Sequence, residues 1–440
     1  MATSREIADS LATEPRREPA AGNYLMVLSV QFYRTRPGHF AVEGAFAEHL
    51  RQLLTALSSL VSRITVTGPE MSAEFYAASG ASLAEIDEQA ERIVYHPLYE
   101  TSASTLAFVA GYPRLLRALY EDVQNATVVH ASTTHDLSRP TEFAALLLAF
   151  WCDKPTVCVS DIDLRNEARM NYTTGTWTLK SYLLARHLYD PIRKLQLHVA
   201  ARKCSLVLLK GQQYARHFGA GRANVKDFLD SAFSKEHLIP REQLDAKLAR
   251  LRDPEQALEL VYFGRLTPYK GLDRCLQAIH EAEQLGVVNL RFSVFGAGAD
   301  EQRLRELSEE LGLGAKVFFH GSVPFGPQLF AKLYASELLL AAPLNEDTPR
   351  SALDAMACAT PILAFDTYYY RDLARSGAVD LVEWPSVSRM AARIAHFAGH
   401  RHELIPMAES ARRFAADNTQ ESWIERRTAW TLQLLAGVSA

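Results

Sequence analysis

The sequence has few cysteines, no long apolar run and almost no excess charge. Its five cysteines are scattered and form no Cys-x-x-Cys pair. We therefore expect neither disulfides nor a structural zinc, and a reducing compartment such as the cytoplasm. The longest apolar stretch, residues 143–151, is too short to span a bilayer. A net charge of -4 over 440 residues argues against a general nucleic-acid binder, because such proteins are basic.

The chain also lacks short repeats and low-complexity tracts. Residues 1–22 are polar, carry charges of both signs and contain no apolar signal region, so we expect a flexible tail. We find no Ser/His/Asp pattern typical of a nucleophilic triad. The length suits two domains of roughly 200 residues each.

Apolar runs of strand character alternate with stretches of helical period. In the first half we expect strands at residues 24–30, 63–67, 93–96, 127–130, 156–160 and 205–209. In the second half we expect strands at residues 258–263, 291–295, 316–320, 337–342 and 361–365. This alternation predicts an α/β protein with two Rossmann-like domains, each built on a parallel sheet.

The expected domains are separated by a charged segment. We assign residues 23–235 to an N-terminal acceptor domain and residues 258–420 to a C-terminal donor domain. The segment between them, 236–257, contains Pro240 and Pro254 and is interpreted as a linker. Residues 421–440 form a last helix that is expected to pack back toward the N-terminal domain.

Two strand-to-helix turns of the second half carry the residues of a phosphate site. In open α/β sheets, ligands bind beyond the carboxyl ends of the strands. In the first turn, Gly264 and Gly271 allow tight backbone paths, while Arg265 and Lys270 supply two cations for a diphosphate. The alternative is a solvated turn with ordinary surface charges.

The second turn precedes a helix and is acidic. The backbone amides of Arg350, Ser351 and Ala352 would point at a phosphate from the start of that helix. Asp354 follows one turn later and can accept from vicinal ribose hydroxyls. The alternative is that Glu346, Asp347 and Asp354 are only capping or surface acids.

These turns resemble those of the retaining glycosyltransferases of family four, the glycosyl transferases group 1. The family has two glutamates separated by seven residues, and here Glu346 and Asp354 have that spacing, the latter in Leu-Asp-Ala-Met-Ala. The basic turn matches as Gly-Arg-Leu-x-x-x-Lys-Gly, and Gly296 matches the family's Gly-x-Gly strand end. The resemblance covers essentially the second half of the chain and is weaker over the first half.

The resemblance implies the GT-B fold, in which two Rossmann-like domains face each other across a cleft. It implies that Arg265 and Lys270 hold a donor diphosphate, near Gly264 and Gly296. Glu346 would face the donor sugar and the reacting atoms, Asp354 would hold the ribose, and Asp372 would help to hold sugar or nucleotide. The residues expected to act in catalysis are Glu346, Asp161, Arg265 and Lys270.

The sequence also departs from the family pattern. Asp354 and Ala359 replace a glutamate and a glycine, and Asp-Thr-Pro-Arg at residues 347–350 replaces a Gly-Phe-Gly-Leu type of loop. With these changes we still expect the site to bind a nucleotide, but the sequence does not determine the donor sugar. Arg350 adds a cation that would suit a charged donor sugar.

Acceptor-side candidates lie in the first half. The resemblance implies that residues 33–40, which include Gly38 and His39, form a loop that approaches the donor phosphate and the acceptor, and the alternative is a flexible surface loop. His130 and His135 end a strand and either line the cleft or are structural. Asp161 and Asp163 spell an Asp-x-Asp pattern that binds divalent metal in another transferase fold. Because the basic turn already supplies cations to the diphosphate, we expect no metal and no cofactor.

We therefore expect transfer of a sugar from a nucleotide-diphosphate donor to a hydroxyl of a glycan, lipid-linked or small-molecule acceptor. Cell-surface polysaccharide or glycoconjugate biosynthesis is the expected context. A nucleotide-sugar epimerase or phosphorylase on the same fold remains open, as does a degenerate protein that binds nucleotide without turnover.

Residues 165–216 are rich in basic side chains with aromatic and aliphatic residues between them. This pattern predicts peripheral contact with an anionic membrane at its inner face and a lipid-linked acceptor. Ordinary solvated faces and an anionic sugar acceptor are the alternatives. The basic residues are Arg165, Arg169, Lys180, Arg186, Arg193, Lys194, Arg202, Lys203, Lys210 and Arg216.

Overall fold

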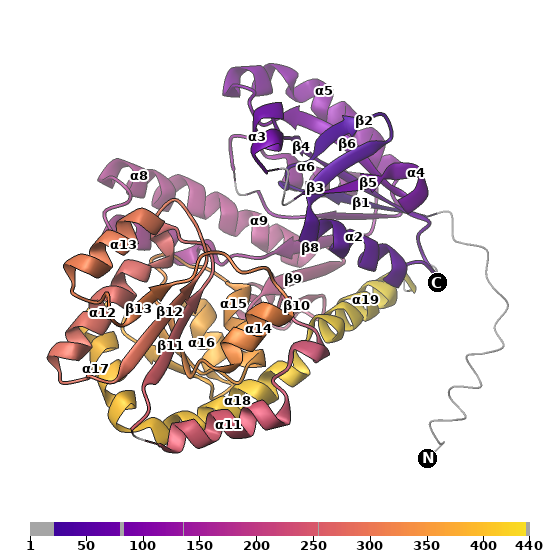
Figure 1. The fold of residues 1–440 in the computed structure, drawn as a ribbon. Coiled ribbons are helices and arrows are strands. Elements are labelled where there is room, and N and C mark those ends of the chain that lie inside the picture. Colours follow the sequence, from indigo (N-terminus) through magenta and orange to yellow (C-terminus); the bar gives the residue numbers. More distant parts are fainter. Residues whose placement is uncertain (1–21, 80–82, 135, 254, 437–440) are drawn as a thin grey trace, which may run out of the picture. The chain divides into compact units, whose positions relative to one another are not determined.

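The computed structural model describes residues 22–79, 83–134, 136–253 and 255–436 (Figure 1). Its strands are β1 (Asn23–Val27), β2 (Tyr33–Arg36), β3 (His39–Glu43), β4 (Arg63–Glu70), β5 (Leu83–Asp87), β6 (Ile93–Glu100), β7 (Val128–Ala131), β8 (Thr156–Ser160), β9 (Leu206–Lys210), β10 (Val225–Phe228), β11 (Leu258–Phe263), β12 (Leu290–Phe295), β13 (Val317–Phe319), β14 (Leu338–Ala341), β15 (Ile362–Phe365) and β16 (Val379–Val382).

The α-helices alternate with these strands along most of the chain. They are α2 (Gly44–Ala56), α3 (Ala73–Ser79), α4 (Glu88–Glu91), α5 (Thr105–Gln124), α6 (Thr141–Trp151), α7 (Glu167–Thr173), α8 (Leu179–Leu184), α9 (Asp190–Lys203), α10 (Gln212–Gly219), α11 (Arg241–Arg252), α12 (Leu272–Gln284), α13 (Glu301–Glu310), α14 (Pro327–Tyr334), α15 (Arg350–Ala357), α16 (Tyr368–Ala374), α17 (Val387–Gly399), α18 (Leu404–Asp417) and α19 (Gln420–Ala436). Short 3-10 segments and one π segment join several of them. Within the part of the chain that the structure describes, no helix combines the length and apolar composition needed to cross a membrane.

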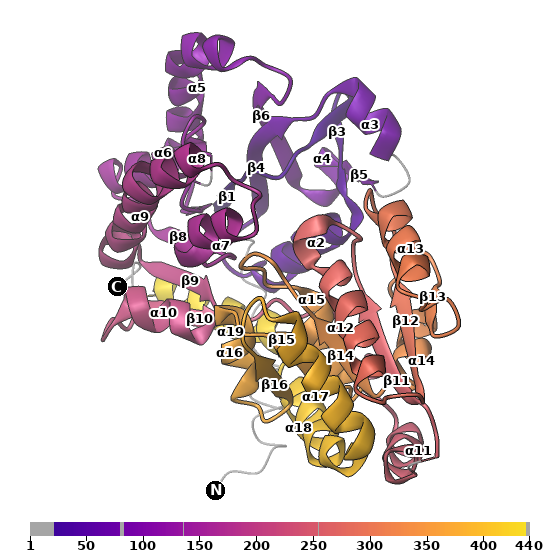
Figure 2. The same ribbon diagram turned by 90° about the vertical axis from the view of Figure 1, so that its left-hand side faces the viewer.

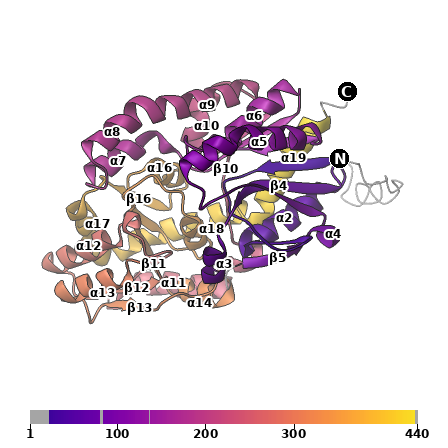
Figure 3. The ribbon, with the colours of Figure 1, turned by 90° about the horizontal axis from the view of Figure 1, so that it is seen from above.

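The first sheet has seven strands in the order β10-β9-β8-β7-β1-β4-β6. β1 pairs in parallel with both β4 and β7. All six strands expected in the first half lie in this sheet. Figure 3 shows α5 and α2 on either side of β4, and α2 buries Leu50 and Leu54.

The second sheet has six strands in the order β13-β12-β11-β14-β15-β16, and its pairs are parallel. It contains the five strands expected in the second half, and β16 in addition. The α/β fold class with parallel sheets is confirmed.

A small antiparallel sheet, β2-β3-β5, was not expected. The segment 33–40, interpreted as a loop, is instead a hairpin in which Gly38 makes the turn at φ +76°. Its strands were missed because β2 is only four residues long and carries two arginines, so it has no apolar run.

The contacts within the chain divide it into two compact units, and each unit consists of segments that are separated in sequence. One unit contains the described residues of 1–159, 196–207 and 424–440, and the other contains those of 160–195 and 208–423. The described part of α19 beyond Trp423 therefore belongs to the first unit, where Arg427 acts electrostatically on Tyr24 and His130. The domain boundaries expected from the sequence stay a prediction.

Two apolar layers enclose the second sheet. Along β11, Leu260 and Tyr262 pack into one layer, whereas Val261 and Phe263 pack into the other. This alternation places a helical layer on each face of the sheet. Figure 2 shows α12 and α17 side by side on one face, and α15 and α18 contact each other in the other layer.

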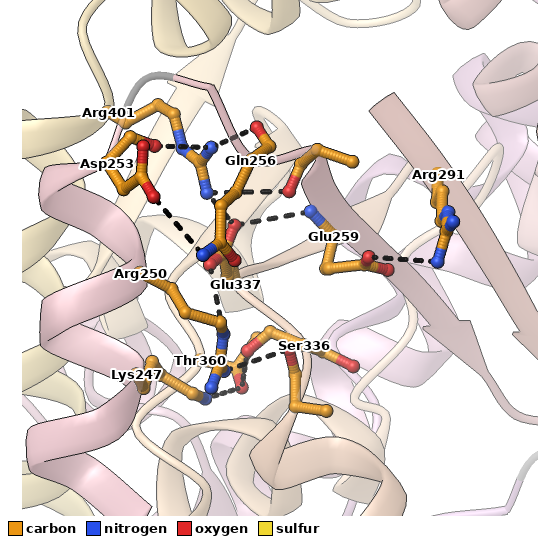
Figure 4. A network of polar contacts seen from close by, with 12 residues as sticks. Lys247, Arg250, Asp253, Gln256, Glu259, Arg291, Ser336, Glu337, Thr360 and Arg401 are labelled. Atoms are coloured by element: carbon orange, nitrogen blue, oxygen red, sulfur yellow. Dashed lines mark hydrogen bonds and ion pairs between the residues drawn. The ribbon is translucent and has the colours of Figure 1, made fainter. Parts of the chain in front are cut away.

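A buried polar network lies at the amino ends of β14 and β15 (Figure 4). Lys247 is fully buried on α11, within the segment interpreted as a linker. Its Nζ donates to the carbonyl oxygen of Cys358 (2.6 Å) and to Oγ1 of Thr360 (2.9 Å). Beside it, Arg401 Nη2 donates to Glu337 Oε2 (2.6 Å). The network ties α11 to the end of α15 and to the strands that lead toward the site described below.

Candidate active site

The basic turn after β11 is fixed by glycine. Gly271 has φ +67°, and a Cβ built on it would lie 1.8 Å from the carbonyl oxygen of Ala342, so only glycine allows this approach. Gly296 similarly lies against the carbonyl oxygen of Gly264. These approaches hold the turn 264–271 beside the carboxyl end of β14, the edge at which ligands bind in such sheets.

Both expected phosphate-binding cations lie on this turn. Arg265 is exposed, and its Nη2 donates to the hydroxyl of Tyr269 (3.3 Å). Lys270 is mostly buried and forms an ion pair with Asp347. A pocket of about 350 Å³ adjoins Lys270, and its lining includes Gly264, Lys270, Asp347, Pro349, Ser351 and Tyr370. The pocket therefore opens between the basic turn and the start of α15.

Glu346 follows β14 and is buried. Its Oε2 accepts from the backbone amide of Tyr368 (3.1 Å), and its Oε1 accepts from Nδ2 of Asn166 (3.3 Å). Burial raises the pKa of Glu346 from 4.5 to about 7. A carboxyl group with such a pKa can exist in either protonation state near neutral pH, which suits a residue at a reacting centre.

The helix α15 begins at Arg350, and Ser351 in its first turn lines the 350 Å³ pocket. The amide of Ala352 already donates to the carbonyl oxygen of Pro349 (3.3 Å), which leaves those of Arg350 and Ser351 without a helical acceptor. One turn later, Asp354 is buried, and burial raises its pKa to about 7. Among the residues that the structure describes, none makes a hydrogen bond to Asp354 Oδ1.

A second, smaller pocket of about 250 Å³ is lined by Asp163, Lys210, Tyr214, Glu346, Thr348, Tyr368, Tyr369 and Asp372. Asp372, on α16, accepts from the backbone amide of Gln213 at the start of α10 through Oδ2 (2.9 Å). The structure thus brings Asp372 to the same pocket as Glu346, with one oxygen engaged by a helix start.

The Asp-x-Asp segment lies beside the Glu346 loop. The side chain of Asp161 is exposed, and its carbonyl oxygen accepts from Thr348 Oγ1 (3.2 Å). Asp163 is buried and both of its carboxylate oxygens accept from Arg165 Nε (2.8 and 3.0 Å). The guanidinium of Arg165 in turn lies 4.5 Å from the ring centroid of Tyr368. Asp163 is therefore the partner of an arginine here.

The acceptor-side candidates lie in the other unit. His39 begins β3, and its Nε2 lies 3.6 Å from Asp87 Oδ2. His130 is buried at the end of β7, where its Nδ1 lies 3.0 Å from the hydroxyl of Tyr24, and burial lowers its pKa to about 3. His130 therefore has the surroundings of a structural histidine, which was one of the two alternatives for this residue. His135 lies outside the described residues.

Sequence reasoning missed three residues of this site. Lys210, which was counted as a surface cation, is buried and donates through Nζ to the carbonyl oxygen of Thr348 (3.1 Å). Asn166 and Tyr368 contact Glu346. A weak signal existed for Lys210 and Tyr368, because each closely follows an expected strand. No local pattern indicates Asn166.

Comparisons with known proteins agree with this geometry. Residues 245–414 match the family model described as "Glycosyl transferases group 1". The putative colanic acid biosynthesis glycosyltransferase WcaL of Salmonella typhimurium is 26% identical over 193 residues, which are 42% of this chain and 47% of that relative. The D-inositol 3-phosphate glycosyltransferase of Corynebacterium jeikeium is 34% identical over 113 residues, 24% of this chain and 26% of that relative. The matches thus span about half the length of these relatives or less.

Solved structures resemble the chain over most of its length. Anabaena Alr3699/HepE in complex with UDP has a TM-score of 0.62 at 15% identity and covers 94% of this chain and 99% of its own. WaaG, a glycosyltransferase involved in lipopolysaccharide biosynthesis, has a TM-score of 0.58 at 14% identity and covers 92% and 98%. At these identities the likeness shows the fold. The chain therefore has the GT-B fold, and its residues 245–414 match the model of the glycosyl transferases group 1 family.

Proposed function

We propose that the protein is a retaining glycosyltransferase that moves a sugar from a nucleotide-diphosphate donor to a hydroxyl acceptor. The observation that carries this proposal is that Lys270, on the basic turn, and Ser351, at the start of α15, line one pocket, with Glu346 on the loop that precedes α15. One neighbour of the same fold, Anabaena Alr3699/HepE, was solved both with UDP and with UDP-glucose, which supports a nucleotide-sugar donor.

Each group has a defined part in this chemistry. Arg265, Lys270 and the free amides of α15 would clamp the diphosphate and stabilise the charge that develops on it as the sugar leaves. Glu346 would face the sugar, Asp354 would hold the ribose, and Asp161 would orient the acceptor or the sugar. Retention rests on the family resemblance, with the acceptor attacking from the face that the diphosphate leaves. Departing phosphate oxygen would take the acceptor proton.

The first test is binding and product analysis. In a thermal-shift screen against nucleoside diphosphates and their sugars, the ligands that carry one particular base should raise the melting temperature of the protein. A ligand that binds only the native state stabilises that state. Product NMR with that donor should then show the donor's anomeric configuration. Inverted product would contradict retention. Product formed from donor alone would favour an epimerase, phosphate dependence a phosphorylase, and binding without any transfer the degenerate protein.

The cations are tested by mutation. Arg265→Ala and Lys270→Ala should each lower kcat/KM for the donor about ten- to a hundredfold, the worth of a charge-assisted hydrogen bond. Arg305→Ala, which removes an exposed arginine paired with Glu301 on α13, is the matched control and should change kcat/KM less than twofold. Unchanged activity in both Arg265→Ala and Lys270→Ala would show that these two cations do not form the donor site.

We propose that catalysis needs no metal, since cations of the protein would neutralise the diphosphate. Excess EDTA should therefore leave the rate unchanged. A rate that falls in EDTA and returns with manganese would overturn this and direct attention to Asp161.

For the acceptor, we propose contact with an anionic membrane through α8 and α9. Figure 3 shows these helices in line. They expose Leu179, Leu183, Leu184 and Leu195 together with Lys180 and Lys194, and the π segment between them, Ala185–Tyr189, exposes Leu188 and Arg186. Such a mixture suits the interface of an anionic bilayer, where each cation contributes about 1 kcal/mol. Three of the basic residues first assigned to this surface are engaged elsewhere: Arg165 with Asp163, Arg193 with Glu167, and Lys210 in the site.

Sedimentation with vesicles tests this contact. Binding should require anionic lipid, weaken with salt and fall at least tenfold in the double variant Lys180→Glu, Lys194→Glu. Arg389→Glu on α17 makes the same type of change and should bind like wild type. Binding that does not depend on lipid charge would contradict membrane contact and favour a soluble acceptor. Full binding by both the double variant and the Arg389→Glu control would have the same meaning.

A further inference from the structure

The cation assigned to the donor phosphate already has an anion beside it. Lys270 Nζ forms an ion pair with Asp347 Oδ2, and the two side chains are only 15% and 19% exposed. Both residues line the 350 Å³ pocket. The protein thus supplies its own carboxylate at the point where a diphosphate oxygen would meet Lys270.

Asp347 also acts on a second cation. Lys210 is buried, and Asp347 is one of the carboxylates whose charge favours its protonated form. The same carboxylate acts electrostatically on the hydroxyls of Tyr369 and Tyr370. Asp347 therefore lies near the groups that surround the pocket, and its carboxylate is one of those that act on Lys210.

The backbone that carries Asp347 is held from several sides. Thr348 accepts from Lys210 through its carbonyl oxygen (3.1 Å) and donates through Oγ1 to Asp161 (3.2 Å). The carbonyl oxygen of Pro349 accepts from the hydroxyl of Tyr369 (3.2 Å). With the loop fixed in this way, an incoming anion can displace Asp347 by rotation of its side chain alone.

We propose that Asp347 is an internal counter-anion of the donor site, which neutralises Lys270 in the free enzyme and is exchanged for the donor diphosphate on binding. This inference rests on the proposed function. A diphosphate must break the Lys270–Asp347 pair before it gains Lys270. Asp347 therefore weakens diphosphate binding and speeds release of the nucleoside diphosphate product.

Calorimetric titration of wild type and variants with UDP, GDP and ADP tests this exchange. Asp347→Asn should bind the preferred diphosphate about tenfold more tightly, and Asp347→Ser should show the same direction. In the Lys270→Ala background, Asp347→Asn should give less than a twofold gain, because the cation that it frees is absent. Asp273→Asn, which removes a carboxylate two residues beyond the basic turn, is the matched control and should change affinity less than twofold.

The outcomes separate the two proposals. If wild type binds one diphosphate and both Asp347 variants bind it equally or more weakly, the exchange is wrong while the donor site stands. A gain that persists in the Lys270→Ala background would also overturn the exchange, because the effect would not pass through that ion pair. If wild type binds none of the three diphosphates, both the proposed function and this inference fail.

Discussion

At the scale of single residues, the site combines groups whose protonation is altered by burial. Glu346 and Asp354 are both buried, and both pKa values are raised to about 7. Their surroundings differ: Glu346 lines a pocket and accepts two hydrogen bonds, whereas Asp354 lies inside α15 and adjoins neither pocket of the site. This difference suggests different parts in the reaction.

We predict that the two carboxylates separate in kinetics. Glu346→Gln should lower kcat about ten- to a hundredfold with little change in donor KM, because its contacts to the sugar matter in the transition state. Asp354→Asn should instead raise donor KM about tenfold, since ribose contacts persist in ground and transition states. Steady-state kinetics with varied donor will measure both, and the reverse pattern would exchange the two roles.

The raised pKa of Glu346 also predicts a pH dependence of stability. Between pH 4.5 and about 7 the folded protein binds a proton at Glu346 that the unfolded chain has released, so this contribution to stability falls as pH rises through that window. Glutamine does not titrate, so the Glu346→Gln variant does not lose stability in this way as pH rises. Its free energy of unfolding relative to wild type should increase from pH 5 to pH 8 in denaturant titrations. A constant difference between the two proteins would show that the pKa is not raised.

At the scale of elements, strand-to-helix turns bring the site together, and the opposite ends of the same strands are held by the Lys247 network. Lys247 reaches the carbonyl end of α15, whose first residues line the donor pocket. α11 therefore supports a site to which it contributes no side chain.

We predict that Lys247→Met destabilises the protein by about 1–3 kcal/mol, because buried acceptors at Cys358 and Thr360 lose their donor. Burial lowers the pKa of Lys247 from 10.5 to about 7. Between these values the unfolded chain binds one more proton than the folded protein, so wild-type stability should rise with pH in this window. The difference in free energy of unfolding between wild type and Lys247→Met should thus grow between pH 7 and pH 9, as measured in denaturant titrations.

Arg241→Met provides the control on the same helix. Arg241 is exposed and pairs only with Asp245 one turn away, so its loss should cost less than about 0.5 kcal/mol at each pH. A Lys247→Met variant as stable as Arg241→Met would mean that the network does not support α15.

At the scale of the whole molecule, the compact units are discontinuous in sequence. The described part of α19 beyond Trp423 belongs to the unit that contains β1 and β7. Arg427, on this helix, acts on Tyr24 and His130 of those strands. The first unit is therefore completed by residues from near the other end of the printed sequence.

We predict that a chain ended after Trp423 is destabilised in the first unit. Hydrogen exchange should quicken in β1 and β7, because they lose the helix that packs near them, while β11 and β14 provide the internal control and should exchange as in wild type. The melting temperature should fall by at least about 5 °C. Equal protection of β1 and β7 in both chains would show that α19 is dispensable for that unit.

The sequence by itself determined the periodic parts of this protein. Buried parallel strands are near-continuous apolar runs, so β8 and β11 could be placed to the residue, and the turn 264–271 could be recognised by its glycines and cations. The short strands β2, β3 and β5 could not, because each is only four or five residues long and has no apolar run of more than three residues. The helix α11 could not be told from a charged linker, since its apolar residues are few among many charges.

Only the tertiary structure decided which groups meet in the site. Asn166 reaches Glu346 across 180 residues of sequence, and Lys270 reaches Asp347 across 77. Lys210 looks like any other basic residue in a basic stretch, yet the fold buries it against Thr348. Such contacts depend on the order of strands in a sheet, which brings distant strand ends to one edge. Local periodicity contains no information about that order, and so the sequence could name the cations but not the anion that holds one of them.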